Sequence, residues 1–272
     1  MSKLLIYFIL TFMLFSEEVK FPTAKRSYWP TDDWKTTQPE KQGIGSSSIN
    51  QAFEYAFART GNEKDRKGFR TDSVIIIKEG HIVGEKYARG YTEKMPHLSW
   101  SVAKAFVNTL MGIAEKDGLL KKEDSASKYF PVLDTKEKKE ITLAHLLTMS
   151  SGLDWNEGYE ASPLNSSVIQ MLYTLGRKDM ATYTAERPLK YKPGTYLYYS
   201  SGDSNLLLGA LKNILKEKYD SYPEEKLFKK IGMKNVTFEK DKSGNFVGSS
   251  YVYATPRDYA KFGYLYLNGG VW

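Results

Sequence analysis

The stretch Leu98-Ser-Trp-Ser-Val-Ala-Lys-Ala-Phe106 places a serine three positions before a lysine, at the start of a strongly apolar helical pattern. The pattern predicts a helix over 101–117, with Gly118 as its stop. On a helix, residues three apart share a face, so the amine of Lys104 can reach the hydroxyl of Ser101. The helix N-terminus favours a developing alkoxide, and burial favours a neutral lysine. The alternative is a capping serine with a lysine that reaches solvent.

The Ser-x-x-Lys pattern is short and occurs twice, so its surroundings decide which copy carries chemistry. The second copy, Ser125-Ala-Ser-Lys128, lies in a charged stretch where nothing would remove water from the lysine. We therefore expect that copy to lie on the surface and the copy at Ser101 and Lys104 to be the candidate nucleophile and base.

Length and composition favour a globular protein, and the sequence shows no cofactor or metal motif, so we expect neither group. The chain has 272 residues, of which 41% are hydrophobic and 14% aromatic, so it can bury a core. The net charge of +7 comes from lysines scattered among acids, and we expect no nucleic-acid partner. The absence of cysteine excludes disulfides, a thiolate zinc site and a cysteine nucleophile. A metal site would need all three histidines, His81, His97 and His145, or carboxylates, and His81 and His145 are interpreted as surface or core histidines rather than catalytic ones.

The N-terminal segment has the pattern of a secretory signal. Lys3 precedes an apolar run over 4–15, and polar residues follow at 16–18. The run is too short to span a bilayer, which favours a signal peptide or an uncleaved anchor within 1–20. We therefore expect the protein to be periplasmic or secreted, with membrane contact only through that anchor. A buried N-terminal helix is the alternative.

The rest of the chain reads as a strand pair followed by helices. Residues 27–45 are predicted to form an irregular arm and 49–59 a helix. Two β-branched runs, 73–78 and 81–87, flank a Gly turn and predict a hairpin. Apolar spacing then predicts further helices over 142–149, 166–175, 203–216, 223–231 and 256–267.

Several motifs in fixed order resemble those of the serine β-lactamase and penicillin-binding-protein-like family, in its class C-related branch. They are the stretch at 98–106, Glu115-Lys-Asp-Gly-Leu119, Ile141-Thr-Leu-Ala-His-Leu-Leu-Thr-Met-Ser-Ser-Gly-Leu153, Pro193-Gly-Thr195, Tyr199-Ser-Ser-Gly-Asp203 and Ala254-Thr-Pro-Arg-Asp258. This branch includes β-lactamases, esterases, D-alanyl-D-alanine peptidases and 6-aminohexanoate-dimer hydrolases. The resemblance implies an α+β fold, with an antiparallel sheet flanked by helices and a mostly helical subdomain. We expect one domain over 28–272, with an N-terminal α/β part at 28–100, a helical subdomain at 101–249 and a return to the α/β part from 250.

The resemblance also implies roles for two residues of the Tyr-Ser-Ser segment. Tyr198 and Tyr199 both resemble the family's second element, and the fixed step from Pro193-Gly-Thr195 selects Tyr199 as the proton shuttle beside Lys104. Ser201 stands where the family more often has asparagine and is expected to bind substrate. This difference favours small amides, esters or peptides over β-lactams as substrates.

The family's third element, a Lys/His-x-Gly triplet on a late strand, is not found where the family places it. Lys242-Ser-Gly244 has the right letters but precedes the 254–258 motif, whereas the family's triplet follows it. We therefore expect the sequence to be incomplete at its C-terminus, without the family's last sheet strands. The hairpin at 73–87 would then have an unpaired edge and an uncovered apolar face, and the chain would be marginally folded. An inactive fragment, or a pseudoenzyme that binds peptidoglycan or another ligand, is the alternative to a hydrolase.

Overall fold

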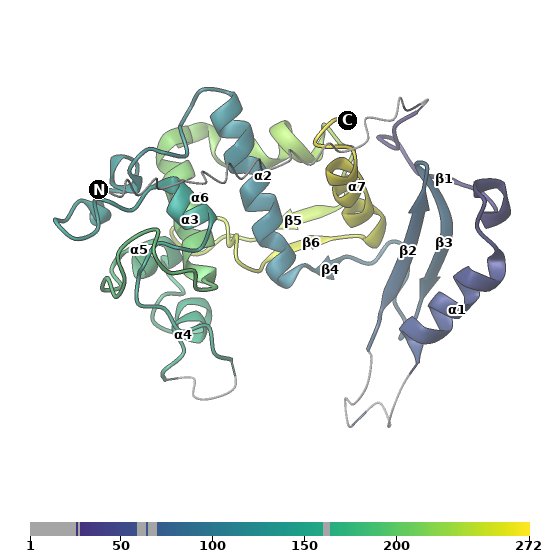
Figure 1. Cartoon of the computed structure of the whole chain (residues 1–272), viewed down its shortest axis with the longest axis horizontal. Coiled ribbons are helices and arrows are strands. Elements are labelled where there is room, and N and C mark those ends of the chain that lie inside the picture. Colours follow the sequence, from purple (N-terminus) through teal and green to yellow (C-terminus); the bar gives the residue numbers. More distant parts are fainter. Residues whose placement is uncertain (1–25, 27, 59–63, 65–69, 160–163) are drawn as a thin grey trace, which may run out of the picture.

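The computed structural model of the chain describes residues 26, 28–58, 64, 70–159 and 164–272. The predicted signal at 1–20 lies outside these residues. Among the described residues, no helix has both the length and the apolar character needed to cross a membrane. The fold is α+β, as expected, with one three-stranded sheet at the end of the molecule that carries α1 and a second beneath the central helices (Figure 1).

The first sheet contains the predicted hairpin together with a strand that the sequence did not reveal. Strands β2 (Ser73–Lys78) and β3 (His81–Tyr87) are antiparallel and have the predicted bounds. Gly80 adopts a φ of 78° in the turn, a conformation that glycine reaches without steric cost. Strand β1 (Lys35–Thr36) lies in the arm that was predicted to be irregular and pairs with β3 in parallel. The strand order is β1-β3-β2, so β2 is an edge of this sheet.

Both faces of the first sheet are covered, so the expectation of an uncovered apolar face is wrong. Helix α1 (Ser46–Phe57) packs Ile49 and Phe53 against Val83 on one face. Helix α7 (Pro256–Leu267) lies on the other face, where Tyr264 packs in one apolar cluster with Ile82 of β3 (Figure 1). Two tryptophans of the N-terminal arm and the tryptophan at position 272 complete that cluster: Trp29, Trp34 and Trp272. One of the two reasons for expecting marginal stability is therefore removed.

The second sheet joins distant parts of the chain beside helix α2. Its strands are β4 (His97–Leu98), β5 (Val236–Phe238) and β6 (Val252–Ala254), in the order β4-β6-β5. Strand β4 pairs antiparallel with β6, which brings the segment before Ser101 next to residues near 250. These strands are too short to show an alternating pattern in the sequence.

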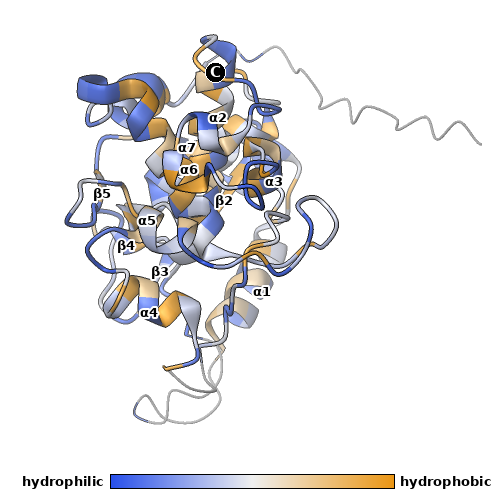
Figure 2. Ribbon diagram, turned by 90° about the vertical axis from the view of Figure 1, so that its left-hand side faces the viewer, coloured by the Kyte–Doolittle hydropathy of each residue, from blue (hydrophilic) through white to orange (hydrophobic). Residues whose placement is uncertain are grey.

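The main core lies between α2 (Ala103–Lys116) and α6 (Ser201–Leu215), whose apolar residues are almost fully buried. Figure 2 shows hydrophobic stretches on these central helices and hydrophilic turns around the outside. Around them lie α3 (Leu143–Leu147), α4 (Ser167–Tyr173) and α5 (Met180–Ala185), of which α5 was not predicted. The helix predicted over 223–231 is a π-helical turn at Glu224–Phe228. Shorter 3-10 turns lie at Pro39–Gln42, Trp100–Val102, Ala126–Lys128, Pro131–Leu133 and Lys216–Lys218.

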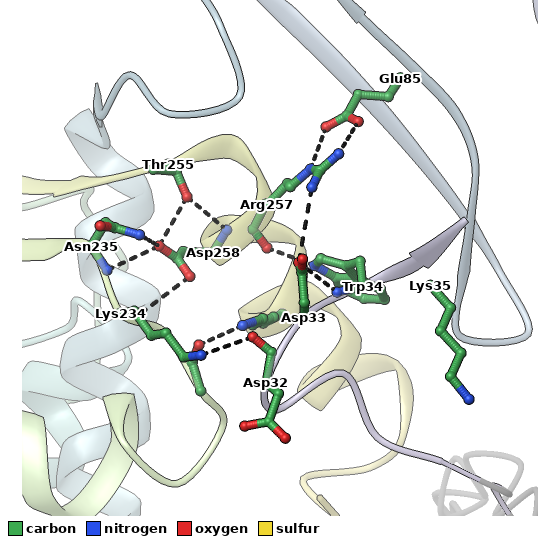
Figure 3. Close-up of polar contacts among 12 residues, drawn as sticks. Asp32, Asp33, Trp34, Lys35, Glu85, Lys234, Asn235, Thr255, Arg257 and Asp258 are labelled. Atoms are coloured by element: carbon green, nitrogen blue, oxygen red, sulfur yellow. Dashed lines mark hydrogen bonds and ion pairs between the residues drawn. The ribbon is translucent and has the colours of Figure 1, made fainter.

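Polar contacts at the start of α7 fasten the N-terminal arm and the first sheet to the rest of the fold. Arg257 donates two hydrogen bonds to the carboxylate of Glu85 on β3, at 2.9 and 2.7 Å, and Trp34 donates its indole N–H to the carbonyl of Arg257 at 3.0 Å (Figure 3). A guanidinium and a carboxylate joined by two hydrogen bonds form a strong and geometrically specific contact. The Thr255 hydroxyl caps the helix by accepting from the backbone N–H of Asp258.

Candidate active site

Ser101 lies on a tight turn between strand β4 and helix α2. The turn is a 3-10 turn at Trp100–Val102, so α2 begins at Ala103, two residues later than the sequence predicted. Trp100 has a φ of 43°, a conformation that costs a bulky residue free energy and that is found most often at functional sites. The residue before the turn, Ser99, ties it to strand β6, because its backbone N–H donates to the carbonyl of Val252 at 2.7 Å. The Ser101 side chain is exposed, so a substrate can reach it.

The side-chain nitrogen of Lys104 contacts three oxygen atoms beside this turn. Its Nζ lies 3.3 Å from Oγ of Ser101, 3.1 Å from Oγ of Ser201 and 2.9 Å from the carbonyl oxygen of Ser249. Asn205 of α6 holds Ser249 by accepting from its backbone N–H at 3.0 Å. The lysine is therefore positioned by a fixed loop as well as by its own helix, and it points at the candidate nucleophile.

Tyr199 also lies beside Lys104, and the contact is made by its aromatic ring. The Nζ atom lies 4.9 Å from the centroid of the Tyr199 ring, within the range of a cation–π contact. Tyr198, the other candidate from the sequence, lines a separate cavity. The four predicted site residues thus lie together: Ser101, Lys104, Tyr199 and Ser201. Their chemical roles remain predictions.

Glu157 is a member of this site that the sequence analysis missed. Its carboxylate accepts from the hydroxyl of Ser201 at 2.5 Å and from the backbone N–H of Ser201 at 2.9 Å. It also accepts from the indole N–H of Trp155 at 2.5 Å and from the hydroxyl of Tyr159 at 3.0 Å. Because Ser201 is the first residue of α6, the carboxylate lies at the positive end of that helix.

A second carboxyl group, that of Asp203, is buried in the first turn of α6. One of its oxygens accepts from the hydroxyls of Ser151 and Ser200, at 2.9 and 3.1 Å. The other oxygen has no hydrogen-bond partner among the described residues. Burial raises the pKa of Asp203 to about 7, although the two hydroxyls act in the opposite direction. The group fixes the loop of Ser151 against the start of α6.

Three sequence features that were not expected to carry chemistry make contacts away from the candidate site. Lys128 is paired with Asp124 at 3.1 Å, on the surface, rather than with Ser125. The triplet at 242–244 forms a turn around the carboxylate of Asp241. His145 accepts the backbone N–H of Thr142 in a helix cap. Among the described residues, no cluster of three or more acidic or histidine side chains could hold a metal ion.

Comparisons with known proteins place this chain in a family. The sequence model of the beta-lactamase family matches residues 56–271. A protein of Escherichia coli (strain K12), provisionally named a D-alanyl-D-alanine carboxypeptidase, is 25% identical over 221 residues, which are 74% of this chain and 50% of that protein. A crystal structure from Bacillus anthracis, provisionally named a 6-aminohexanoate-dimer hydrolase, has 25% identity and a TM-score of 0.65 over 74% of this chain and 55% of that one.

A more distant structure shows the same fold. FmtA from Staphylococcus aureus has 16% identity and a TM-score of 0.61, and the match covers 85% of this chain and 68% of FmtA. The chain spans about half the length of the curated relatives it matches, since the shares covered are 50% and 54% of two of them.

Proposed function

The chain belongs to the beta-lactamase family, and on that premise we propose that it is a serine hydrolase that forms an acyl-enzyme on Ser101. One observation carries the proposal: Nζ of Lys104 lies 3.3 Å from Oγ of Ser101 on an exposed, strained turn. A nucleophile needs a base within hydrogen-bond reach, and Lys104 lies within that reach of Ser101.

The proposed reaction uses the three side chains in sequence. The Ser101 hydroxyl oxygen attacks the carbonyl carbon of the substrate, and its proton passes to the base formed by Lys104 and Tyr199. The same base returns the proton to the leaving nitrogen or oxygen, which departs as an amine or alcohol. Water then attacks the ester on Ser101 and releases the acid. The ring of Tyr199 is 43% exposed, which gives it room to turn its hydroxyl toward Ser101 when substrate binds.

We propose small amides, esters or short peptides as substrates. The relatives' names, a carboxypeptidase and an aminohexanoate-dimer hydrolase, describe proteins that act on amides. Ser201, which stands where the family more often has asparagine, is engaged with Lys104 and Glu157. We infer the preference for open-chain amides and esters over β-lactams from that replacement.

Covalent labelling with a fluorophosphonate probe tests the proposal. We expect the wild-type chain to be labelled at Ser101 and Ser101→Ala to remain unlabelled. Ser125→Ala is the matched control, because it changes the other Ser-x-x-Lys copy, and it should be labelled as the wild type is. The wild type and Ser125→Ala should also hydrolyse a p-nitrophenyl ester, whereas Ser101→Ala should not. Absence of labelling in the folded wild type, or equal labelling of Ser101→Ala, would contradict the proposal.

We also propose export from the cytoplasm, which is supported by the sequence pattern of residues 1–20. Fractionation of bacteria that express the chain with a C-terminal tag tests this. We expect the tagged wild-type chain in the periplasm or the medium. A variant in which Leu5 and Ile9 of the apolar run are both replaced by aspartate should remain in the cytoplasm.

A further inference from the structure

An apolar groove of about 650 Å³ lies between the second half of α2, the segment that carries the π-helical turn at Glu224–Phe228, and the end of α7. Figure 1 shows α2 and α7 side by side. The volume of the groove falls in the range of small-molecule binding pockets. About two turns of α2 separate it from Ser101, and none of the candidate catalytic side chains lines it.

Apolar side chains from all three segments line the groove. They are Ile113 of α2, Leu227 and Ile231 of the π-helical segment, and Leu265 of α7. The last three also belong to the main core, so their positions are fixed by packing. Such a surface gains free energy when it takes an apolar group out of water.

Gly112 leaves the groove open down to the backbone of α2. A Cβ at this position would have no neighbour within 4 Å. Gly112 is not among the glycines with positive φ, so the backbone conformation does not require a glycine here. Glycine in the middle of a helix is less favourable than alanine. A ligand in the groove can therefore contact the helix backbone at a point where any larger residue would take up the space.

The charged side chains that line the groove are all lysines: Lys116, Lys226 and Lys230. Lys226 is paired with Asp117 at 2.7 Å. Lys116 and Lys230 form no ion pair with any carboxylate of the described residues. In the part of the chain that the structure describes, no acidic side chain lines the groove. A negatively charged group would therefore meet two lysines that no carboxylate already occupies.

We propose that this groove binds the anion of a long-chain fatty acid. Its hydrocarbon chain would lie on the apolar side chains, and its carboxylate would lie at Lys116 and Lys230. An uncharged apolar ligand would make no use of the lysines, and a small anion would leave the apolar surface in water, so the two properties together favour an amphiphile with a negative head. This inference goes beyond the proposed hydrolysis, because such binding does not require Ser101.

Calorimetric titration of the full chain with dodecanoate, below the concentration at which it forms micelles, tests the inference. We expect one molecule to bind per chain with a Kd below about 0.1 mM. Decanoate, which is two methylene groups shorter, should bind about tenfold more weakly. Dodecyltrimethylammonium has the same tail with a positive head and should also bind at least about tenfold more weakly than dodecanoate. Absence of dodecanoate binding, or equal binding of the two head groups, would overturn the inference.

A pair of glycine variants localises the binding. Gly112→Leu places a side chain in the open space and should abolish dodecanoate binding in a variant with a normal circular dichroism spectrum. Gly263→Leu is the matched control, because Gly263 also lies in a helix with no neighbour within 4 Å of a Cβ, but does not line the groove. It should bind dodecanoate as the wild type does. Equal binding by the two variants would place the ligand elsewhere and overturn the inference.

A pair of double lysine variants tests the head group. Lys116→Gln with Lys230→Gln should reduce the preference for dodecanoate over dodecyltrimethylammonium to less than about threefold. Lys121→Gln with Lys229→Gln removes the same charge from lysines outside the groove and should keep the preference.

A second copy of the chain is the other possible occupant of the groove. Sedimentation velocity would then show a wild-type dimer that Gly112→Leu abolishes, and this result would overturn the inference. Each of these outcomes leaves fluorophosphonate labelling of Ser101 untouched, so the two proposals can fail separately.

Discussion

Lys104 and Glu157 are connected through a single hydroxyl group, that of Ser201. Nζ of Lys104 donates to Ser201 Oγ at 3.1 Å, and the Ser201 hydroxyl donates to the carboxylate of Glu157 at 2.5 Å. Ser201 is fully buried, and hydrogen bonds made away from water are electrostatically stronger than exposed ones. The orientation of the lysine beside Ser101 therefore depends on a carboxylate that does not contact Ser101.

Replacement of Ser201 by alanine should slow acylation of Ser101. Lys104 then loses one of its three oxygen partners, and hydrogen bonds to charged groups contribute roughly 1.5–3 kcal/mol. The rate of fluorophosphonate labelling should fall by about 10- to 100-fold in a variant with a normal circular dichroism spectrum. An unchanged labelling rate would show that Ser201 does not position Lys104.

Replacement of Glu157 by glutamine should destabilise the fold around the start of α6. The amide would turn one N–H donor toward groups that all donate to the carboxylate: Trp155, Tyr159 and Ser201. We expect the free energy of unfolding, measured by urea titration, to fall by about 1–3 kcal/mol. Glu123→Gln, in an exposed pair with Lys122, is the control and should change it by less than about 0.5 kcal/mol. Equal effects of the two variants would contradict this view of Glu157.

The buried carboxyl group of Asp203 should make stability depend on pH. Its pKa is about 7 in the folded chain and near 3.9 in an unfolded one, so the folded state binds more protons between these values. The contribution of Asp203 to the free energy of unfolding should therefore be full below about pH 4, fall as pH rises, and level off above about pH 7.

Urea titrations between about pH 4.5 and pH 8 measure this dependence. In Asp203→Asn the fall should be smaller than in the wild type, since the side chain no longer titrates. Asp220→Asn, which changes an exposed carboxyl group, should keep the wild-type slope. Parallel curves for wild type and Asp203→Asn would show that Asp203 does not titrate in this range.

Two glycines with nearly the same positive φ separate backbone strain from steric conflict. Gly152 and Gly90 have φ values of 79° and 80°. A Cβ at Gly152 would lie 2.1 Å from the carbonyl oxygen of Tyr191, whereas a Cβ at Gly90 would have no neighbour within 4 Å. Gly90→Ala should cost about 1–2 kcal/mol of stability, and Gly152→Ala at least about 3 kcal/mol. Thermal unfolding of both variants tests this, and equal losses would contradict it.

Helices and strands whose ends are marked by neighbouring residues could be predicted from the sequence. The bounds of β2, β3 and α7 match their predictions, because a glycine turn marks the hairpin and Thr255 with Pro256 marks the start of the helix. Helix α6 begins at Ser201 rather than at Asp203, since the capping residue is Ser200. The serines at 200, 201 and 204 are all residues that could cap a helix, so the sequence alone does not show which of them does.

Features that depend on distant pairing could not be predicted. Strands β4 and β6 have two and three residues, and only their pairing across the fold makes them strands. Glu157 lies 44 positions before Ser201 in a loop without a regular pattern, so only the folded chain shows that it belongs to the site. The nucleophile candidate was found because Ser101 and Lys104 are close in the sequence as well as in space.

Helix α7 has a consequence for the motions of the whole molecule. One side of it packs on the sheet of β1, β2 and β3, while its Phe262 ring stacks on Phe106 of α2 with centroids 3.9 Å apart. An opening that detaches α7 would expose both neighbours at once. Amide hydrogens in β3 and in the middle of α2 should therefore exchange with solvent in a shared cooperative event, with similar opening free energies. The helix that follows Ser101 would then open together with the distant sheet.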